Sequence, residues 1–486
     1  MSATKASNGH STHNDTVSLL INGEERSCDR TFDVTSPVTS KVSHRCYSAG
    51  VSEAKDAVQA AADALPGWRQ TPPIERRNIF LKAAEIMEKR REELVHNMLQ
   101  ETGDVESWCN FNLDVAIDFI KDVAGRCGTI EGGIPQTMDP NLTALVLKEP
   151  YGVVLSIAPW NAPYILGTRS VCFPLGAGNT VVLKATELAP KTMWGIVSVF
   201  NEAGLPKGAL NMIASEPSLA AEVTSSLVSN PHVKKINFTG STAVGRIIGK
   251  LAGEHLKPMV QELGGKAPAI VWEDADLELA AKQCALGSFI NAGQVCMSTE
   301  RVIVHKAIAQ KFKETFSSTV EKIFSSGSGA PILISAAAVE KNKKLIRDAT
   351  SKGASILYGS LDTESTSSTR MSPIILEKVT KDMDIFYGES FGPSVSIFEV
   401  ETEEEAIEMA NDTEYGLTSA VFTEDLKRGL RFAKAIETGA VHINGMSIHD
   451  ESALPHGGAK ASGYGRFNAA HGLEEWVRTK TITFKN

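Results

Sequence analysis

Three short stretches of the chain carry side chains that could act together on a carbonyl carbon. Cys296 follows Gly-Gln-Val, Glu262 precedes Leu-Gly-Gly-Lys, and Asn161 follows Ala-Pro-Trp. A thiolate attacks a carbonyl carbon well, and the hemithioacetal can then lose a hydride to a nicotinamide. The remaining thioester needs a water activated by a base such as Glu262, and its oxyanion needs N–H donors such as Asn161 and the Cys296 backbone. Taken singly, each has an ordinary alternative, since an isolated glutamate is nearly always a surface charge and Pro-Trp-Asn could be a packed turn.

A second group of residues could hold a dinucleotide. The chain has no Gly-x-Gly-x-x-Gly, but Phe-Thr-Gly-Ser-Thr-Ala-Val-Gly at 238–245 follows an expected strand and opens an expected helix over 243–255. Amide N–H groups at a helix start, with glycine allowing close approach, can bind a pyrophosphate. The plain alternative is that Gly-Ser merely caps the helix.

Lys184 ends another apolar strand, and Glu187 follows three residues later. This is where the ribose of a nucleotide binds in parallel sheets. A carboxylate there accepts hydrogen bonds from the 2′-hydroxyl and repels a 2′-phosphate, which favours NAD over NADP. The alternative is a solvated surface pair.

Composition narrows the class of protein. At 486 residues about two or three domains are expected. The 42% hydrophobic and 22% charged residues are typical of soluble globular proteins, and the net charge of −9 argues against nucleic acid or an anionic membrane as partner. We expect a disordered tail over 1–16, no membrane-spanning helix and a cytosolic location. The seven scattered cysteines indicate neither a disulfide framework nor a zinc site, and no metal is expected.

The pattern of apolar residues predicts an α/β protein. Helices are expected at 52–68 and 73–102, and a short strand at 17–23 that enters an Asn22-Gly23 turn. Residues 144–156 form an extended apolar stretch interrupted at Pro150. Short β-branched runs then alternate with helical segments, which predicts a doubly wound parallel sheet, and a second alternating stretch over 301–438 predicts a second α/β domain. Segments 325–329 and 362–369 are expected to be surface loops.

Taken together, these stretches resemble the NAD(P)-dependent aldehyde dehydrogenase superfamily, from about Val17 to the end of the chain. Besides Lys184 with Glu187, the matching elements are Ala-Pro-Trp-Asn at 158–161, Phe-Thr-Gly-Ser at 238–241, Glu-Leu-Gly-Gly-Lys at 262–266, Gly-Gln-Val-Cys at 293–296, Glu-Ser-Phe-Gly-Pro at 389–393, Ala-Asn-Asp-Thr-Glu-Tyr-Gly-Leu at 410–417 and His-Gly-Gly-Ala-Lys-Ala-Ser-Gly at 456–463. The spacing of 34 residues between Glu262 and Cys296 is also similar to the family's.

The resemblance implies a role for each matching residue. Cys296 is then the nucleophile, Glu262 the general base and Asn161 the oxyanion donor. The residues implied in cofactor binding are Trp160, Lys184, Glu187, Gly240, Ser241, Gly245, Leu263, Glu389 and Phe391, with NAD as cofactor and NADP as the alternative. Two departures are Gly388 before Glu389, where the family often has Glu, and His456, where many members have Phe; the second puts the pocket wall in doubt.

The resemblance also implies a domain plan. A Rossmann-like, doubly wound NAD-binding domain is expected over 17–130 and 151–264, and an α/β catalytic domain over 265–467. A β-strand oligomerisation arm is expected over 131–150 and 468–486, with the strand near 131–149 pairing with 479–484 across a dimer. A homodimer or homotetramer is the expected assembly.

A narrower resemblance is to salicylaldehyde, vanillin and benzaldehyde dehydrogenases. It rests on Asn-Ala-Pro-Tyr-Ile-Leu-Gly-Thr-Arg at 161–169, Cys-Met-Ser-Thr-Glu-Arg at 296–301 and His-Ile-Asn-Gly-Met-Ser-Ile-His-Asp-Glu at 442–451. Arg169 could orient a phenolic oxygen, or it could be a buried arginine that holds a helix by a salt bridge. The other candidates for the substrate pocket are Trp108, Tyr164, Met297, His449 and His456.

An aromatic or bulky apolar aldehyde is therefore the expected substrate. The alternatives are an aliphatic or semialdehyde dehydrogenase, which could serve a secondary-metabolite pathway, a CoA-acylating member and a non-catalytic descendant. A CoA-acylating enzyme does not need Glu262, and a non-catalytic protein has no use for an intact set of Cys296, Glu262 and Asn161.

Overall fold

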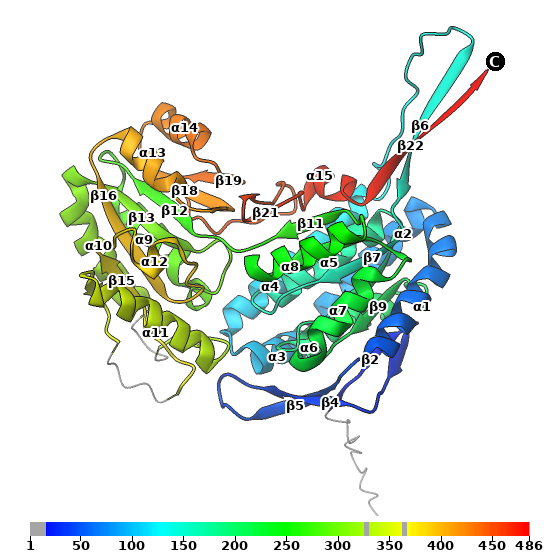
Figure 1. Ribbon diagram of the computed structural model, residues 1–486, viewed down its shortest axis with the longest axis horizontal. Helices are drawn as coiled ribbons and strands as arrows, with labels where there is room; N and C mark the ends of the chain where they lie inside the picture. The colour runs from blue at the N-terminus through cyan, green and yellow to red at the C-terminus, as the bar shows by residue number, and fades with distance from the viewer. Residues whose placement is uncertain (1–15, 325–329, 362–366, 486) are drawn as a thin grey trace, which may run out of the picture.

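The computed structural model describes residues 16–324, 330–361 and 367–485. It has a mixed α/β fold of two lobes, each built on its own sheet, and a two-stranded arm that projects from one lobe (Figure 1). The expected tail over 1–15 and the expected loop residues 325–329 and 362–366 lie outside the described residues, while Thr16 begins β1. In the part of the chain that is described, none of the helices is both long and apolar enough to span a bilayer.

The first lobe is built on an eight-stranded sheet. Its order is β21 (Gly463–Tyr464), β11 (Met259–Glu262), β10 (Val233–Thr239), β7 (Val153–Ile157), β8 (Thr180–Lys184), β9 (Leu210–Ile213), β2 (Leu19–Ile21) and β3 (Glu24–Arg26). The five strands from β11 to β9 are parallel. The lobe also holds α1 (Val51–Gln70), α2 (Pro73–Lys89), α3 (Arg91–Thr102), α4 (Glu106–Arg126), α5 (Pro163–Gly176), α6 (Pro190–Glu202), η1 (Pro217–Leu219), α7 (Ala220–Ser229), α8 (Thr242–Glu254), α15 (Ala469–Glu474) and the small sheet β1 (Thr16–Val17), β5 (Val42–Tyr47) and β4 (Thr31–Thr35).

The order of this sheet creates a switch point beside its central strand. The chain runs from β7 through β8 to β9 on one side, and then returns to place β10 and β11 on the other side of β7. Crossovers therefore leave β7 and β10 in opposite directions, which opens a crevice at the carboxyl ends of these two strands. The segments that follow them, 158–161 and 240–241, are two of the stretches singled out by the sequence.

The second lobe is built on a seven-stranded sheet. Its order is β14 (Ser355–Tyr358), β15 (Ile374–Glu377), β16 (Ser394–Val400), β13 (Thr299–His305), β12 (Ala267–Val271), β18 (Thr418–Phe422) and β19 (Ala440–Ile443). All pairs are parallel except β14 with β15. The helices are η2 (Ile290–Gly293), η3 (Lys306–Ile308), α9 (Leu277–Phe289), α10 (Ala309–Phe324), α11 (Ala336–Ser351), α12 (Asp384–Tyr387), α13 (Glu403–Asn411) and α14 (Leu426–Ala435), and β17 (Tyr415–Gly416) pairs with β20 (Ala459–Lys460).

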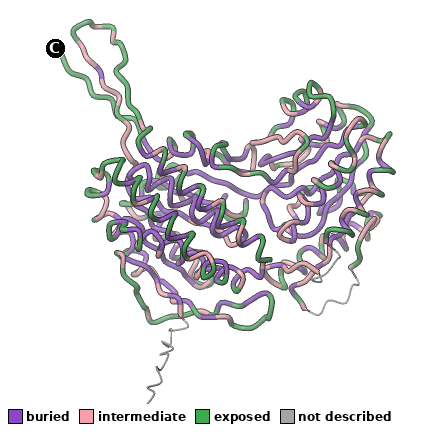
Figure 2. The backbone as a smooth tube through the Cα atoms, turned by 180° about the vertical axis from the view of Figure 1, so that it is seen from behind, coloured by how far each residue is buried: buried purple, intermediate pink, exposed green. Residues whose placement is uncertain are grey.

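The arm consists of β6 (Leu142–Pro150) and β22 (Val477–Lys485), which pair antiparallel along their whole length. The expected pairing of these segments is present, but it joins two strands of the same chain and not strands across a dimer. The residues of β22 are mostly exposed and those of β6 mostly half-buried, whereas the central strands of both lobes, such as β7, β8 and β12, are buried (Figure 2). The reason is geometric: a two-stranded ribbon that leaves the lobe has no layer to cover its faces.

The structure differs from the sequence prediction in three further places. The helix expected over 73–102 is two helices, because Arg90 leaves helical geometry (ψ 15°) between α2 and α3 and pairs with Glu93. Residues 259–262 form β11, which the alternation did not single out. Finally, β21 lies in the range expected for the catalytic domain but pairs with β11 of the first sheet, since the chain crosses back before it reaches the arm.

Candidate active site

The crevice at the switch point is a pocket between the two lobes. Its lining comes from the segments at the ends of β7, β10 and β11, from α5, and from two loops and α11 of the second lobe. The lining residues are Pro159, Trp160, Asn161, Leu166, Thr239, Gly240, Ser241, Glu262, Leu263, Gly264, Cys296, Lys341, Glu389 and Phe391. The three residues expected to do chemistry, which lie up to 135 residues apart in the chain, line this one pocket.

Cys296 is presented by a turn with unusual backbone geometry. Asn291, Ala292 and Gly293 all have positive φ angles, of 49°, 56° and 71°. A Cβ on Gly293 would lie 2.2 Å from the carbonyl oxygen of Gly392, so only glycine fits there. Non-glycine residues in this region cost free energy and persist only where the surroundings hold them, which is common at functional sites.

Gln294 and Asn161 hold this turn. Gln294 Nε2 donates to the carbonyls of Asn291 and Ile332, and its Oε1 accepts from the amide of Ile334. The Asn161 Nδ2 donates to the carbonyl oxygen of Gln294 at 3.1 Å, and the Asn161 carbonyl accepts from Asn291 Nδ2 at 3.0 Å. A carboxamide has two N–H groups, so Asn161 keeps a second donor for an oxyanion.

Glu262 ends β11 and is fully buried. Its Oε2 accepts a hydrogen bond from Arg169 Nη2 at 2.6 Å and lies 3.9 Å from His456 Nε2. Its Oε1 has no hydrogen-bond partner among the described residues. Burial by itself would raise the pKa of Glu262, but His456, Arg169 and the Cys296 thiol outweigh it and lower the pKa to about 2. Glu262 is therefore ionised at neutral pH and has one oxygen free to accept a proton.

The same surroundings have the opposite effect on Cys296. Burial, and then the negative charge of Glu262, raise the pKa of the Cys296 thiol well above its usual value, and Arg169 opposes them only in part. The resting thiol is therefore protonated, with an ionised carboxylate beside it.

The first-lobe side of the pocket has the features that a dinucleotide requires. Ser241 caps α8, with its Oγ accepting from the amide of Val244, so the first amides of this helix face the crevice. A Cβ on Gly240 would lie 2.7 Å from the Phe238 ring, and one on Gly245 would lie 2.5 Å from Leu263. These positions therefore have to be glycine for the start of α8 to pack against Phe238 and Leu263. The residues present fit a pyrophosphate.

The second-lobe side presents Glu389 and Phe391. Glu389 accepts a hydrogen bond from the Gly265 amide at 2.8 Å, and burial followed by the charge of Glu300 raises the pKa of Glu389 to about 7. Phe391 has a φ of 50° and its ring lies edge-on to Trp160, with ring centres 6.0 Å apart. A buried Lys266–Glu300 pair fixes this loop, because Glu300 accepts from the amides of Ser390 and Phe391.

Lys184 and Glu187 lie at the end of β8, as the sequence placed them. Lys184 is 7% exposed, which excludes the alternative of a fully solvated pair, and burial lowers the pKa of its ammonium while Glu187 opposes the shift. A buried cation and a half-exposed carboxylate at the carboxyl end of a parallel strand suit the ribose of a dinucleotide.

Comparison with known proteins identifies the family. The model of the aldehyde dehydrogenase family matches residues 24–482. The chain belongs to the aldehyde dehydrogenase family. A vanillin dehydrogenase of Pseudomonas fluorescens is 41% identical over 97% of this chain and 98% of its own, and a salicylaldehyde dehydrogenase of Pseudomonas putida is 38% identical over 96% and 98%. The crystal structure of a salicylaldehyde dehydrogenase from Pseudomonas putida G7 complexed with salicylaldehyde superimposes with a TM-score of 0.93, at 37% identity and over 97% of this chain and 98% of that one.

This aldehyde dehydrogenase is therefore an oxidoreductase that acts on aldehydes, in a family that depends on NAD or NADP. The pocket at the switch point is lined both by Cys296, Glu262 and Asn161 and by residues that the sequence predicted to bind the cofactor, such as Gly240 and Glu389.

The prediction that Tyr164 contacts the substrate is wrong. Tyr164 is fully buried, and its hydroxyl donates to the Leu94 carbonyl at 2.8 Å. In the helix α5, Tyr164 is about 200° around the axis from Leu166, which lines the pocket, so Tyr164 faces α3 and the core.

Arg169 is committed to two carboxylates. Its Nη2 donates to Glu262 and its Nη1 donates to Asp450 Oδ2 at 2.9 Å, and the side chain is 1% exposed. Its guanidinium lies 4.5 Å from the centre of the Phe467 ring. These contacts agree with the salt-bridge alternative for Arg169 and not with a group waiting for a phenolic oxygen.

The remaining substrate candidates take different positions in this aldehyde dehydrogenase. Trp108, on α4, donates its Nε1–H to the Asn161 carbonyl at 3.4 Å and therefore lies next to the catalytic segment. Met297 is buried among the apolar residues beside Cys296. His449 is 41% exposed and pairs with Glu451 at 2.8 Å, which places it nearer the surface than His456.

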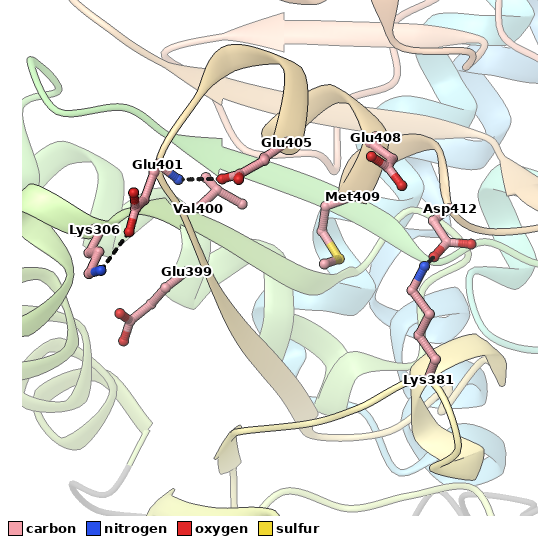
Figure 3. A pocket seen from close by; sticks show the side chains of 9 residues that line it. All are labelled: Lys306, Lys381, Glu399, Val400, Glu401, Glu405, Glu408, Met409 and Asp412. Atoms are coloured by element: carbon pink, nitrogen blue, oxygen red, sulfur yellow. Dashed lines mark hydrogen bonds and ion pairs between the residues drawn. The ribbon is translucent and has the colours of Figure 1, made fainter.

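A second pocket lies elsewhere in the second lobe and carries none of the expected site residues. It is bordered by η3, β16 and α13, and Lys306 and Lys381 in it are paired with Glu401 and Asp412 (Figure 3). These pairs make it a polar surface hollow. In residues 16–324, 330–361 and 367–485, no group of three or more His, Cys, Asp or Glu side chains is arranged to hold a metal ion.

Sequence reasoning missed several residues that shape this site. Asp450 and Phe467 hold Arg169, and Lys266 with Glu300 holds the loop of Glu389. Asp450, Lys266 and Glu300 stood inside stretches already singled out, but no role was inferred for them. Glu300 lies near the start of β13, just before the apolar residues of that strand. A charged residue inside an apolar strand is the signal that could have indicated a buried ion pair.

Proposed function

We propose that this enzyme oxidises aromatic aldehydes to carboxylic acids through a thioester on Cys296, with NAD as the preferred cofactor. The observation that carries the proposal is the meeting of Cys296, Glu262 and Asn161 in one pocket at the switch point of the first sheet. The names of the relatives, vanillin and salicylaldehyde dehydrogenase, support the aromatic substrate class.

The residues of the pocket divide the reaction between them. Cys296 Sγ bonds to the aldehyde carbon as its thiol proton passes to solvent, and Asn161 Nδ2–H with the Cys296 amide stabilises the oxygen that becomes negative. The chemistry that a bound dinucleotide supplies is the acceptance of a hydride from this carbon. Glu262 takes a proton from the water whose oxygen attacks the thioester carbon. The carbon–sulfur bond then breaks, the Cys296 sulfur recovers that proton from Glu262, and the carboxylic acid is released.

The proposal assigns cofactor contacts to the residues around the crevice. Gly240, Ser241 and the start of α8 would hold the pyrophosphate, Glu389 the nicotinamide ribose, and Lys184 with Glu187 the adenosine ribose. The proposal includes a cytosolic location, supported by the composition, and a homo-oligomer, supported by the projecting arm.

A panel of aldehydes tests the substrate class. We expect kcat/KM, measured as NADH formation, to be higher for salicylaldehyde, vanillin and benzaldehyde than for hexanal and succinate semialdehyde. An apolar tunnel discriminates by buried area, which amounts to roughly 1–3 kcal/mol between an aryl and a short aliphatic aldehyde. A preference for succinate semialdehyde over every aromatic compound would overturn the aromatic assignment and leave the family unaffected.

Cys296→Ser tests the covalent step. The variant should bind NAD with unchanged affinity, measured by fluorescence titration, yet form no NADH, because a hydroxyl at this position lacks thiolate reactivity. Substantial residual turnover would remove the thioester mechanism.

A further inference from the structure

The catalytic carboxylate of Glu262 is held by a chain of buried groups from three parts of the molecule. Arg169 on α5 donates to Glu262 Oε2 at 2.6 Å and to Asp450 Oδ2 at 2.9 Å. Asp450 Oδ1 accepts in turn from Asn468 Nδ2 at 2.6 Å. The side chains of Glu262, Arg169 and Asp450 are 0%, 1% and 11% exposed, so the two ion pairs are shielded from water.

We propose that Arg169, anchored by Asp450, is a positioning residue that holds Glu262 for hydrolysis of the thioester and does not recognise the substrate's phenolic oxygen. This inference rests on the proposed function, in which Glu262 activates water. The name clamp is used below for Arg169, Asp450 and Asn468.

The geometry assigns different tasks to the two carboxylate oxygens. Arg169 binds Oε2, which lies 3.9 Å from His456, while Oε1 has no hydrogen-bond partner among the described residues. Because Oε2 is held by Arg169, a proton can be accepted only at Oε1. The buried carboxylate therefore presents one defined oxygen as the base. Without the cation, the same carboxylate would be an unpaired buried charge, which is costly.

The anchoring of Arg169 makes the alternative role unfavourable. A substrate oxygen that took a hydrogen bond from Nη1 or Nη2 would compete with a carboxylate for a side chain that is already stacked on Phe467. Charge-assisted bonds of this kind are stronger than a bond to a neutral phenol. The arginine is therefore a fixed part of the site.

The charged groups around Glu262 predict how the clamp affects the pH dependence. Arg169 faces it from α5, His456 from the segment before β20, and the Cys296 thiol from the turn after η2, while Asp450 lies behind Arg169 and Glu389 acts on Cys296. Arg169 and His456 favour the ionised form of Glu262, and burial opposes it. Removal of Arg169 should therefore raise the pKa of the base and move the acid limb of the kcat profile to higher pH.

The test compares Arg169→Leu, Arg169→Lys and Asp450→Asn with wild type in pre-steady-state and steady-state assays. With Arg169→Leu we expect a burst of NADH that approaches one molecule per active site, and then slow steady-state turnover. The kcat should fall by about tenfold or more, which is part of the roughly 10²–10⁴-fold rate enhancement that a positioned base contributes. The loss should be equal for salicylaldehyde, vanillin and benzaldehyde. Arg169→Lys, which keeps the charge, should recover part of kcat, and Asp450→Asn should show a smaller loss of the same kind.

Lys235→Met is the matched control, because it removes another buried cation of the first lobe, paired with Glu475 and outside the pocket. Its burst, kcat and pH profile should stay as in wild type even if it unfolds at a lower temperature. If Arg169→Leu fails to fold, the kcat and pH profile of Arg169→Lys and Asp450→Asn still test the proposal.

Two results would overturn the inference. A loss confined to the hydroxylated aldehydes, with the burst and pH profile unchanged, would make Arg169 a substrate contact. A lower unfolding temperature with unchanged kcat and pH profile would make it a structural residue only. Failure of the proposed function gives a different result. In that case Cys296→Ser and Glu262→Gln would form NADH as wild type does.

Discussion

Two carboxylates line the same pocket, and their surroundings shift their pKa values in opposite directions. The pKa of Glu262 is lowered to about 2 because His456 and Arg169 outweigh the effect of burial. The pKa of Glu389 is raised to about 7, because burial prevails and Glu300 adds a like charge. Such a divergence assigns different roles to two acids of one site. Glu262 suits a base that is always ionised, and Glu389 suits a hydrogen-bonding group whose charge can change on binding.

Glu262→Gln should separate the two halves of the reaction. We expect a burst of NADH followed by a stall at the acyl-enzyme, because an amide cannot accept the proton of the attacking water. Rapid-mixing absorbance at the NADH band measures both phases. Glu254→Gln, an exposed change on α8, should behave as wild type. A complete lack of burst would place Glu262 before deacylation, in activation of the thiol.

Glu389 should make cofactor affinity depend on pH. Its carboxylate accepts hydrogen bonds with both oxygens, and most strongly, when it is ionised, so the affinity for NAD should rise as pH increases from about 6 to about 8, through the pKa of about 7. Since this folded-state pKa lies above the ordinary 4.5, the free protein should also lose stability as pH rises from about 4.5 to about 7, the range in which the folded form holds a proton that the unfolded form has released. Calorimetric titration of wild type and Glu389→Gln checks both, and equal pH dependence in the two would contradict the assignment.

Glu187 should set the choice of cofactor. Glu187→Gln removes the charge that a 2′-phosphate would meet, so kcat/KM for NADP relative to NAD should rise about tenfold, within the roughly 1–3 kcal/mol of one polar contact or charge clash. Steady-state kinetics with both cofactors gives the ratio, and Glu222→Gln, exposed on α7, is the control. Equal use of NAD and NADP by wild type would refute this placement of Glu187.

At the scale of elements, the site depends on how closely two segments of backbone approach. The segment after β11 runs against the turn of Cys296, and a Cβ on Gly265 would lie 2.1 Å from the Cys296 carbonyl oxygen. One residue earlier, a Cβ on Gly264 would lie 2.6 Å from a carboxylate oxygen of Glu389. The two glycines therefore set the distance between the base, the nucleophile and the nicotinamide side of the crevice.

Gly265→Ala should displace the nucleophile. Since the backbone of Cys296 has to move, we expect a loss in kcat on the order of 100-fold, the effect of a misplacement of about 1 Å, and a loss of about 1–3 kcal/mol in stability. Gly253→Ala on α8, where a Cβ meets nothing within 4 Å, should leave both unchanged. Activity assays and urea unfolding measure the two effects, and full activity in Gly265→Ala would show that the turn can yield.

At the scale of the molecule, the active site lies between the lobes while the arm points away from them (Figure 1). One face of the arm carries two large apolar residues, Ile482 and Phe484, which are 40% and 47% exposed, and Ile482 pairs with Leu145. A two-stranded ribbon is marginally stable by itself in water, so an arm of this kind is best explained as one that packs on another copy.

A double change on the arm should therefore alter the assembly and leave the chemistry of a single site intact. Ile482→Lys with Phe484→Lys should lower the mass measured by light scattering toward that of one chain. Thr481→Lys with Thr483→Lys, on the opposite face of the same strand, is the matched control and should keep the wild-type mass. A wild-type mass in the apolar-face variant would exclude this face as an interface.

The sequence by itself determined the type of fold and the family, and it predicted the residues that act on the aldehyde. Alternating strands and helices predicted the parallel sheets, and short stretches around Asn161, Glu262 and Cys296 predicted the chemistry, because these depend on local pattern and on residue type. The stretches at 238–241 and 184–187 likewise lie where the sequence placed them.

The tertiary structure alone decided the directions and partners of the side chains. Tyr164 lies two residues from Leu166 but faces the core, and Arg169 binds Glu262 and Asp450, which lie 93 and 281 residues further along the chain. The break at Arg90 and the strand β11 escaped the pattern for the same reason. A buried charge takes whichever partner the packing of distant segments brings within about 3 Å, and no local periodicity contains that information.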